Sequence, residues 1–385
     1  MNTKELDKEY VAGTYGRFDV AIKSGKGSTL YDEDDKEYID FGSGIAVNAF
    51  GASDDVWKQA IISQLDKIQH TSNLYYNEMG AKLAQLLCTK TGMKKVFFSN
   101  SGAEANECAI KTARKYGTDQ NPDKDVIITL ENSFHGRTIT TLSATGQDVF
   151  HKNFTPFTEG FVHTPANDID ALRSKINSNV AAIMIEIVQG EGGVNTLSPE
   201  FLTEIEKITT EKDILLIIDE VQTGNGRCGK LYSYMNYDIT PDIVSTAKGL
   251  AGGLPMGATL LGEKVENTLS KGTHGSTFGA NPVCCAAAIS NIERFTDEFL
   301  SEVMQKSQRI ISELTETKGV KSISGLGLML GIETEKPASE IIARCIEKGL
   351  LVLSAKEKVR LLPPLNISDE ELTKGLEILK GVIEE

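Results

Sequence analysis

Two residues with the chemistry of a reactive site follow apolar stretches of this sequence. Lys248 lies in "STAKGLAGGLPMG", among small residues and without an acidic neighbour, so we expect it to be withdrawn from solvent. A desolvated lysine has a lowered pKa and is a nucleophile toward aldehydes. Asp219 ends the run "ILLIID"; alone, such a carboxylate is a metal ligand, a helix cap or the partner of a buried cation. Together the two residues indicate pyridoxal phosphate (PLP), whose ring nitrogen needs an acidic partner.

The string "FFSNSGAEANECAIKTAR" offers a binding site for the phosphate of such a cofactor. Ser101, Gly102 and Ala103 stand between an expected strand and an expected helix. Free backbone N–H groups and the positive end of the helix dipole face an anion there. The same string also fits an ordinary capping box made by Ser101 and Glu104, and both interpretations can hold at once.

The string "ENSFHGRT" adds an aromatic ring and a cation. Phe134 can stack on a pyridine ring, and Arg137 can bind a carboxylate through two hydrogen bonds. A core phenylalanine and a surface arginine are the alternatives, and for His135 we expect a structural role.

The glycine-rich string "GNGRCGK", residues 224–230, resembles two nucleotide-binding loops. A triphosphate loop requires Ser or Thr after its lysine, but Leu231 follows Lys230. A dinucleotide loop begins directly after a strand, but "EVQT" intervenes here. A nucleotide-binding regulator therefore remains an alternative that the spacing disfavours.

Composition and charge exclude several classes of protein. The 385 residues carry a formal net charge of -14, which argues against a nucleic-acid surface. The six cysteines show no zinc-binding or disulfide spacing, so we expect no metal site and a reducing compartment. Since the sequence has neither a signal-like start nor a long apolar run, we expect no membrane span and a cytoplasmic location.

The elements that must position these residues follow an alternating pattern. From about residue 95 to residue 250, short apolar strands alternate with amphipathic helices, which predicts an α/β fold with a largely parallel sheet. In such sheets ligands bind outside the carboxyl ends of the strands. A hairpin is expected around residues 32–36. We predict an N-terminal segment (1–48) that packs with a C-terminal small domain (297–385), and a large cofactor-binding domain (49–296).

With these groups in order, the sequence resembles the class III (ω-amino acid) aminotransferases of the type I PLP-dependent fold. The matching strings are "NSGAEANE", "FHGRT", "VQGEGGV", "IIDEVQTGNGRCG", "STAKGLAGGLPMGA", "HGSTFGANP" and "VRLLPPLNI". They cover nearly the whole chain in the family's order. The resemblance implies a large domain with a mainly parallel seven-stranded sheet and a smaller α+β domain.

The resemblance also implies roles for the cofactor-binding residues. Lys248 would bind PLP covalently and move the reacting proton, and Asp219 would bond the protonated ring nitrogen. The other positions that match the family's cofactor-binding residues are Ser101, Gly102 and Ala103 at the phosphate, Phe134 on the ring, Gln222 at the phenolic oxygen, and Thr277 from a second subunit. The Thr277 contribution implies a homodimer with shared active sites.

Four further positions are implied to bind substrate: Arg137, Glu191, Ser276 and Arg360. By resemblance, Arg137 binds the carboxylate remote from the reacting amine, whereas Arg360 binds the α-carboxylate of glutamate. An ion pair with Glu191 would mask Arg360 while the first substrate is bound.

The substrate expected from the resemblance is an acylated ornithine. The strings "FGSGIAVNAFG" and "VRLLPPLNI" are most similar to members that move the terminal amine of N2-acetylornithine to 2-oxoglutarate in arginine biosynthesis, giving glutamate and a semialdehyde. Gly44 stands near the place where ornithine-specific relatives carry tyrosine, which favours the acylated substrate. Ornithine, succinylornithine and 4-aminobutyrate are the alternatives within the family.

Overall fold

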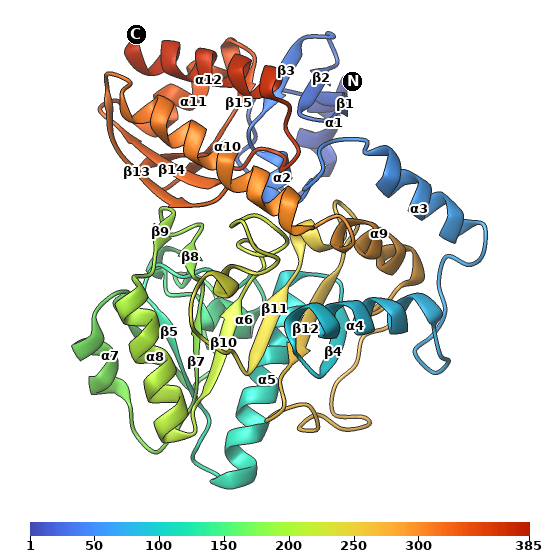
Figure 1. Cartoon of the computed structure of the whole chain (residues 1–385), viewed down its shortest axis with the longest axis vertical. Coiled ribbons are helices and arrows are strands. Elements are labelled where there is room, and N and C mark those ends of the chain that lie inside the picture. Colours follow the sequence, from blue (N-terminus) through green and yellow to red (C-terminus); the bar gives the residue numbers. More distant parts are fainter.

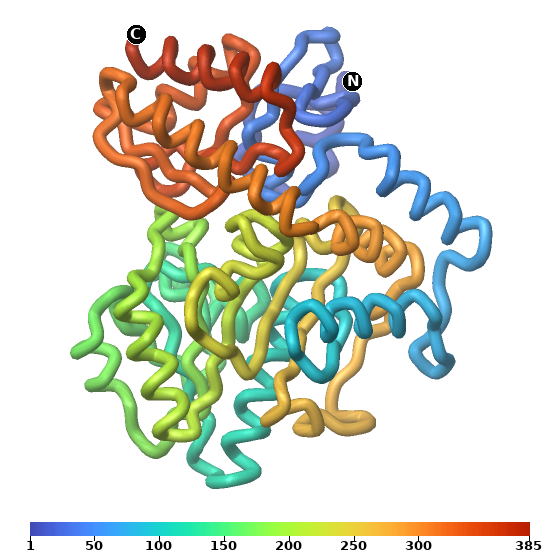
Figure 2. The backbone as a smooth tube through the Cα atoms, viewed as in Figure 1, coloured from blue at the N-terminus to red at the C-terminus, as the bar shows by residue number.

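The computed structural model describes residues 1–385 as a large α/β part and a smaller part (Figure 1). Both ends of the chain lie in the smaller part, at one end of the molecule (Figure 2). The largest apolar cluster contains residues from both parts, for example Ile39, Leu216 and Leu379, so one continuous core connects them. None of the helices combines the length and the apolar character that crossing a bilayer requires.

The large part is built around a seven-stranded sheet, which confirms the predicted fold class. In spatial order its strands are β4 (Lys95–Ser99), β12 (Gly257–Leu261), β11 (Ile243–Thr246), β10 (Leu215–Asp219), β7 (Val180–Ile185), β5 (Val126–Leu130) and β6 (Phe161–Thr164). Every residue of β7, β10, β11 and β12 is buried, as their continuous apolar sequences require.

One strand departs from the parallel arrangement. β12 runs antiparallel to both of its neighbours, β11 and β4. The segment between β11 and β12 is only residues 247–256, which is too short for the crossover that parallel neighbours need. The chain therefore turns back directly after Lys248.

Helices cover this sheet and lie beside it. They are α3 (Asp55–Leu65), α4 (Glu78–Thr91), α5 (Gly102–Gln120), α6 (Ile139–Ala144), α7 (Ile169–Lys175), α8 (Pro199–Lys212) and α9 (Pro282–Ile292). The longest of these, α5, packs across β4, β5, β7, β10, β11 and β12, whereas α8 packs on β7 and β10. Because α5 starts directly after β4, its N-terminus lies at the carboxyl edge of the sheet.

The smaller part contains two four-stranded sheets. One has the antiparallel order β13 (Val320–Leu326), β14 (Met329–Thr334), β17 (Lys358–Leu361) and β16 (Leu353–Ala355). The other joins β1 (Ile22–Lys26), β2 (Thr29–Asp32) and β3 (Glu37–Asp40) to β15 (Leu350–Leu351), which runs parallel to β3. The helices of this part are α10 (Asp297–Thr315), α11 (Ala338–Glu347) and α12 (Asp369–Glu384).

The remaining elements are short. They are α1 (Thr3–Tyr10), α2 (Ser43–Ala46), β8 (Val188–Gln189), β9 (Asn195–Thr196) and three 3-10 turns (Asp148–Phe150, Ser233–Asn236 and Lys248–Leu250). The hairpin predicted around residues 32–36 is confirmed, since β2 pairs antiparallel with β3. Asp32 stabilises its turn by accepting the backbone N–H groups of Asp34 and Lys36.

Candidate active site

A cavity of about 430 Å³ lies at the carboxyl edge of the large sheet, as expected for a ligand site in such a fold. Its lining comes from the segments that follow β4, β5, β7, β10 and β11, together with Val47 of the N-terminal segment. Nine of the predicted residues line it: Ser101, Gly102, Ala103, Phe134, Arg137, Glu191, Asp219, Gln222 and Lys248. Of the other three, Arg360 contacts two of these lining residues, whereas Ser276 and Thr277 lie outside the cavity.

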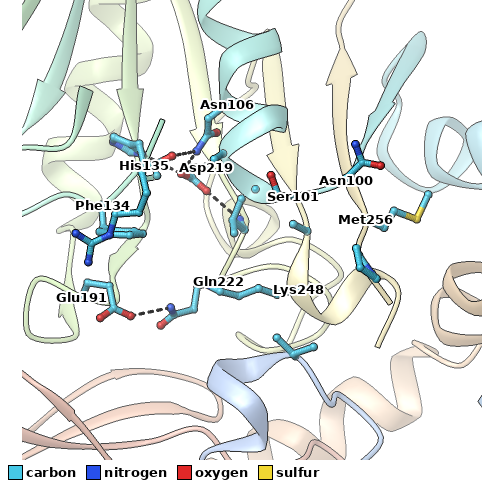
Figure 3. A pocket seen from close by; sticks show the side chains of 18 of the residues that line it. Asn100, Ser101, Asn106, Phe134, His135, Glu191, Asp219, Gln222, Lys248 and Met256 are labelled. Atoms are coloured by element: carbon cyan, nitrogen blue, oxygen red, sulfur yellow. Dashed lines mark hydrogen bonds and ion pairs between the residues drawn. The ribbon is translucent and has the colours of Figure 1, made fainter. Parts of the chain in front are cut away.

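Asp219 is held in place by three donors at the end of β10. Its Oδ2 accepts a hydrogen bond from Asn106 Nδ2 at 2.7 Å and lies 2.8 Å from Nδ1 of His135. Its Oδ1 accepts the backbone N–H of Val221 at 2.9 Å. Asn106 also donates to the carbonyl of His135 at 2.7 Å, so the three side chains form one buried group (Figure 3). The structural role predicted for His135 agrees with this contact, and Asn106 was not predicted.

Glu186 is a second buried carboxylate that sequence reasoning missed. It follows β7 as Asp219 ends β10, and it accepts the backbone N–H of Phe134 at 2.9 Å. Burial raises the pKa of Glu186 to about 7; His135 opposes this shift and the negative charge of Asp219 adds to it. The rule that located Asp219, a polar residue directly after an apolar strand, applies equally to the Glu186 of "VAAIMIE".

Lys248 follows β11 after one alanine, in a backbone conformation with φ +46°. Its amine has no carboxylate within ion-pair distance. Burial lowers the pKa of Lys248, although the negative charges of Glu191 and Asp219 act in the opposite direction. A positive φ costs a non-glycine residue free energy, and such strained positions cluster at functional sites. The amine is therefore available in its neutral, nucleophilic form at a lower pH than an ordinary lysine.

The N-terminus of α5 has the geometry of an anion-binding site. Ser101 caps the helix by accepting the N–H of Glu104 at 3.2 Å, while the N–H groups of Gly102 and Ala103 have no acceptor in the chain. A Cβ at Gly102 would lie 2.6 Å from Cγ1 of Val221, so only glycine fits this close approach to the loop after β10. The capping role and the phosphate-binding role are therefore compatible.

Phe134 and Arg137 form an aromatic and cationic wall of the cavity. Phe134 packs edge to face with Phe150, with ring centroids 5.9 Å apart. The guanidinium carbon of Arg137 lies 3.9 Å from the centroid of the Phe150 ring. Arg137 is exposed and has no acidic partner, so its hydrogen-bond donors are free for a carboxylate.

Arg360 and Glu191 form the predicted ion pair. Arg360 Nη1 lies 2.5 Å from Glu191 Oε1, and Nη2 lies 3.4 Å from Oε2. Arg360 also donates to Gln222 Oε1 at 3.2 Å, and Gln222 Nε2 donates to Glu191 at 3.3 Å. Burial acts to raise the pKa of Glu191, but the charge and hydrogen bond of Arg360 bring it below its ordinary value. The amide of Gln222 is thus bonded to both members of the pair.

The two remaining predicted residues lie in a segment beside the phosphate-binding loop. Ser276 Oγ accepts hydrogen bonds from Asn100 Nδ2 at 3.2 Å and from the N–H of Gly279 at 3.0 Å. Thr277 is exposed and contributes nothing to the cavity of its own chain. Its role stays a prediction, because it requires a second subunit.

The residues that line the cavity fit PLP. A phosphate site at a helix N-terminus, a buried carboxylate and a lysine with lowered pKa line one cavity, and Phe134 borders it. In addition, Nε2 of His135 and Oδ1 of Asn106 are buried without a partner. Such unpaired polar atoms are costly in a closed core and common at sites built for a ligand.

Comparison with known proteins agrees with this geometry. The sequence profile of the family described as "Aminotransferase class-III" matches residues 10–383. An acetylornithine aminotransferase of Haemophilus ducreyi is 52% identical, over 99% of this chain and 98% of that protein. The corresponding enzyme of Caldanaerobacter subterraneus is 44% identical, over 98% of both chains.

Solved structures give the same result. An ornithine aminotransferase from Toxoplasma gondii superposes with a TM-score of 0.94 at 31% identity, covering 99% of this chain and 93% of that one. An N-acetylornithine aminotransferase from Stenotrophomonas maltophilia has a TM-score of 0.86 at 34% identity, with 98% of both chains covered. The chain therefore belongs to the class III aminotransferases, a family of enzymes whose cofactor is PLP.

Proposed function

We propose that this enzyme transfers the terminal amino group of N2-acetyl-L-ornithine to 2-oxoglutarate, producing N-acetyl-L-glutamate 5-semialdehyde and L-glutamate. The observation that carries the proposal is the Glu191–Arg360 ion pair beside a free Arg137. One arginine is masked and one is open, as an enzyme needs when its two amino donors present their carboxylates differently. The acetylornithine aminotransferases that are 41–52% identical to the chain support the same substrate.

PLP, when bound, supplies an aldehyde carbon that condenses with amines and a ring that accepts electron density from the substrate carbon. Lys248 would hold the cofactor covalently in the resting enzyme. Its amine, when free, would accept a proton from the substrate carbon and return that proton later in the reaction. The lowered pKa of Lys248 suits this role, because only the neutral amine accepts a proton.

Asp219 would keep the ring nitrogen of the cofactor protonated. A buried carboxylate stabilises a cation strongly, because little water screens the pair. Asn106, His135 and the N–H of Val221 orient both oxygens of Asp219 before any ligand binds. The electrostatic environment of the nitrogen is thus organised in advance, and no reorientation is required during the reaction.

The arginines decide which end of a substrate faces Lys248. Arg137 binds the carboxylate of acetylornithine that lies away from the reacting amine. Arg360 stays neutralised by Glu191 during that half-reaction and is released to bind the α-carboxylate of glutamate in the other. Gln222 contacts both Arg360 and Glu191, and it would also hold the phenolic oxygen of the cofactor.

We also infer a homodimer with shared active sites. Leu74, Tyr75 and Tyr76 are largely exposed, as is Phe278. Asn73 joins the two segments by donating to the carbonyls of residues 276 and 279, so these apolar side chains belong to one surface. A second copy of the chain is the occupant we propose for it, which would bring the partner subunit's Thr277 to the phosphate.

The predicted division into residues 1–48, 49–296 and 297–385 is part of the proposal. Pairing of β3 with β15 supports packing of the N-terminal segment with the C-terminal domain. We propose a cytoplasmic location as well. Its support is the state of the six cysteines, all of which are free thiols, as is usual in a reducing compartment.

A spectroscopic titration tests the proposal. We expect the absorbance of the enzyme-bound cofactor to bleach with acetylornithine and to recover with 2-oxoglutarate. Ornithine, succinylornithine and 4-aminobutyrate are titrated in parallel. Efficient bleaching by free ornithine without a response to acetylornithine would refute the substrate, and protection by ATP or NAD of a colourless protein would favour a nucleotide-binding regulator. Sedimentation of the same sample tests the dimer.

A further inference from the structure

Arg227, in the glycine-rich loop after Asp219, is a buried cation without a use in the chemistry above. Its exposed fraction is 2%, and no carboxylate lies within ion-pair distance. Burial lowers the pKa of Arg227 to about 10, although the negative charge of the nearby buried Asp40 acts in the opposite direction. Burying a guanidinium that has no ion-pair partner costs free energy, so its other contacts must stabilise it.

The side chain of Arg227 joins three segments that are distant in the sequence. Its Nη1 donates to the carbonyl of Leu328 at 3.1 Å and to that of Pro363 at 2.5 Å. Its Nη2 donates to Ser43 Oγ at 3.4 Å, and Ser43 Oγ donates to the carbonyl of Leu362 at 2.6 Å. The carbonyl of Arg227 in turn accepts the N–H of Leu328 at 2.9 Å. A planar guanidinium can serve such divergent acceptors, whereas a lysine amine is a single point donor.

Two of these acceptors lie at one end of the strand pair that carries Arg360. Leu328 directly precedes β14, and Pro363 follows β17 by two residues. The two strands pair with each other so that Gly331 lies opposite Arg360. Arg227 therefore holds the β14–β17 ladder at the ends that lie nearest to the loop after β10.

The same loop meets the other end of the Arg360 side chain. Gln222, five residues before Arg227, accepts a hydrogen bond from Arg360 Nη1. Two residues of this loop therefore act near Arg360. Gln222 contacts its guanidinium, and Arg227 binds the backbone that follows it. The side chain of Arg360 is 4% exposed, whereas that of its partner Glu191 is 31% exposed.

We propose that Arg227 is a positioning residue for substrate selection. By holding the backbone around Arg360, it keeps this guanidinium at a fixed place while the more exposed Glu191 side chain moves between the two half-reactions. Loss of Arg227 lets the β14–β17 ladder shift, and the α-carboxylate site of glutamate is then misplaced. The inference rests on the proposed function, since it uses Arg360 as the glutamate site.

The test compares R227Q with wild type and with R114Q. Arg114 is a matched control, because it also donates to a main-chain carbonyl, that of Glu159, but lies on α5. We expect R227Q to raise KM for glutamate and 2-oxoglutarate about tenfold and KM for acetylornithine less than threefold. The KM values of R227K are expected to fall between those of R227Q and wild type. R114Q should change the KM values for glutamate and acetylornithine equally or not at all.

Hydrogen exchange of the cofactor-free protein gives a readout that does not depend on activity. In R227Q the backbone amides of residues 328–332 and 359–362 should exchange faster, and those of β7 should not change. A folded R227Q with unchanged exchange and an unchanged ratio of the KM values overturns the proposal. If neither Arg227 variant folds, S43A decides: it should raise the glutamate KM two- to threefold and speed exchange at Leu362, and no change in either quantity overturns the proposal.

Failure of the proposed function is distinguishable from failure of this inference. If the wild type does not turn over acetylornithine, the substrate is wrong, but the exchange experiment still measures whether Arg227 holds residues 359–362. If the wild type is active and the variants show neither effect, only the positioning role is wrong.

Discussion

The two ends of the cavity are built differently. At one end, Asp219 is 2% exposed and its oxygens are occupied by Asn106, His135 and a backbone N–H, all from the large part of the chain. At the other end, Arg360 comes from β17 of the smaller part, and its partner Glu191 has a side chain that is 31% exposed. The first end is closed and fixed, and the second contains a group that can move.

This difference follows from what each end must recognise. The ring nitrogen of a resident cofactor is the same in every turnover, so a rigid carboxylate gives the largest electrostatic effect at no cost of reorganisation. Two substrates with different carboxylates must share the other end. In the proposed function, the ion pair of Glu191 and Arg360 neutralises the arginine for one substrate and opens for the next. Substitutions at the fixed end should therefore reduce the rate, and substitutions at the other end should alter the choice of substrate.

The largest loss of turnover is expected from substitution of Lys248, which lies between the two ends. In the proposed function, K248A removes the covalent attachment and the proton-transferring amine together, so we expect turnover to fall by at least about 10⁴-fold. K230A is the matched control, because Lys230 is an exposed lysine close in sequence, and it should stay within about twofold of wild type. Multiple turnovers by K248A would show that another group carries the proton.

At the fixed end, D219N should reduce kcat on the order of 10³-fold while the protein still binds PLP. The amide keeps the shape of the carboxylate but cannot stabilise a protonated ring nitrogen. D242N serves as control, since Asp242 also bonds the backbone of β10, accepting the N–H of Leu216 at the opposite end of the strand. If both variants lose activity to the same extent, the loss results from destabilisation of β10 and not from the charge of Asp219.

At the movable end, E191Q should change selectivity more than rate. Without the negative charge, Arg360 attracts the α-carboxylate of acetylornithine and presents the wrong carbon to Lys248. We expect kcat/KM for acetylornithine to fall about 100-fold relative to that for glutamate, measured as separate half-reactions. E204Q removes the acid of a surface ion pair with Arg173 and should leave the ratio unchanged. An equal loss for both substrates would contradict the masking role of Glu191.

The sequence was sufficient to predict Asp219 and Lys248 because both follow apolar strands, whereas Asn106 and Glu186 were missed. Lys248 and Asp219 stand at strand ends that a parallel sheet brings to one edge, so local pattern and topology together place them. The same rule would have found Glu186. The seven-stranded sheet followed from the family resemblance, and the antiparallel β12 differs because its connection to β11 is short.

The movable end was less accessible to sequence reasoning. The Glu191–Arg360 pair was predicted only through the resemblance, since 169 positions separate the two residues. The contacts of Arg227 with Leu328 and Pro363 span 101 and 136 positions, and no local pattern encodes them. The glycine-rich loop resembles nucleotide-binding loops, although its spacing disfavours that function, and its buried arginine joins the two parts of the molecule. Contacts between residues so far apart in the sequence depend on how the small part packs on the large one.

The smallest effect on turnover is expected at Glu186, which tests whether the fixed end is closed to water. Because the pKa of Glu186 is raised to about 7, the folded protein keeps a proton that the unfolded chain loses near pH 4.5. Folded protein therefore binds more protons between these values, and its stability falls as pH rises through this window and is level above it.

E186Q has no such proton, so its stability relative to wild type should increase by on the order of 2 kcal/mol between pH 5 and pH 8. Urea unfolding of the cofactor-free proteins at both pH values measures this difference. E263Q, a change at an exposed glutamate, is measured in the same way as the control variant. A pH-independent difference for E186Q would mean that water reaches Glu186, and the contrast between a closed end and an open end would then be wrong.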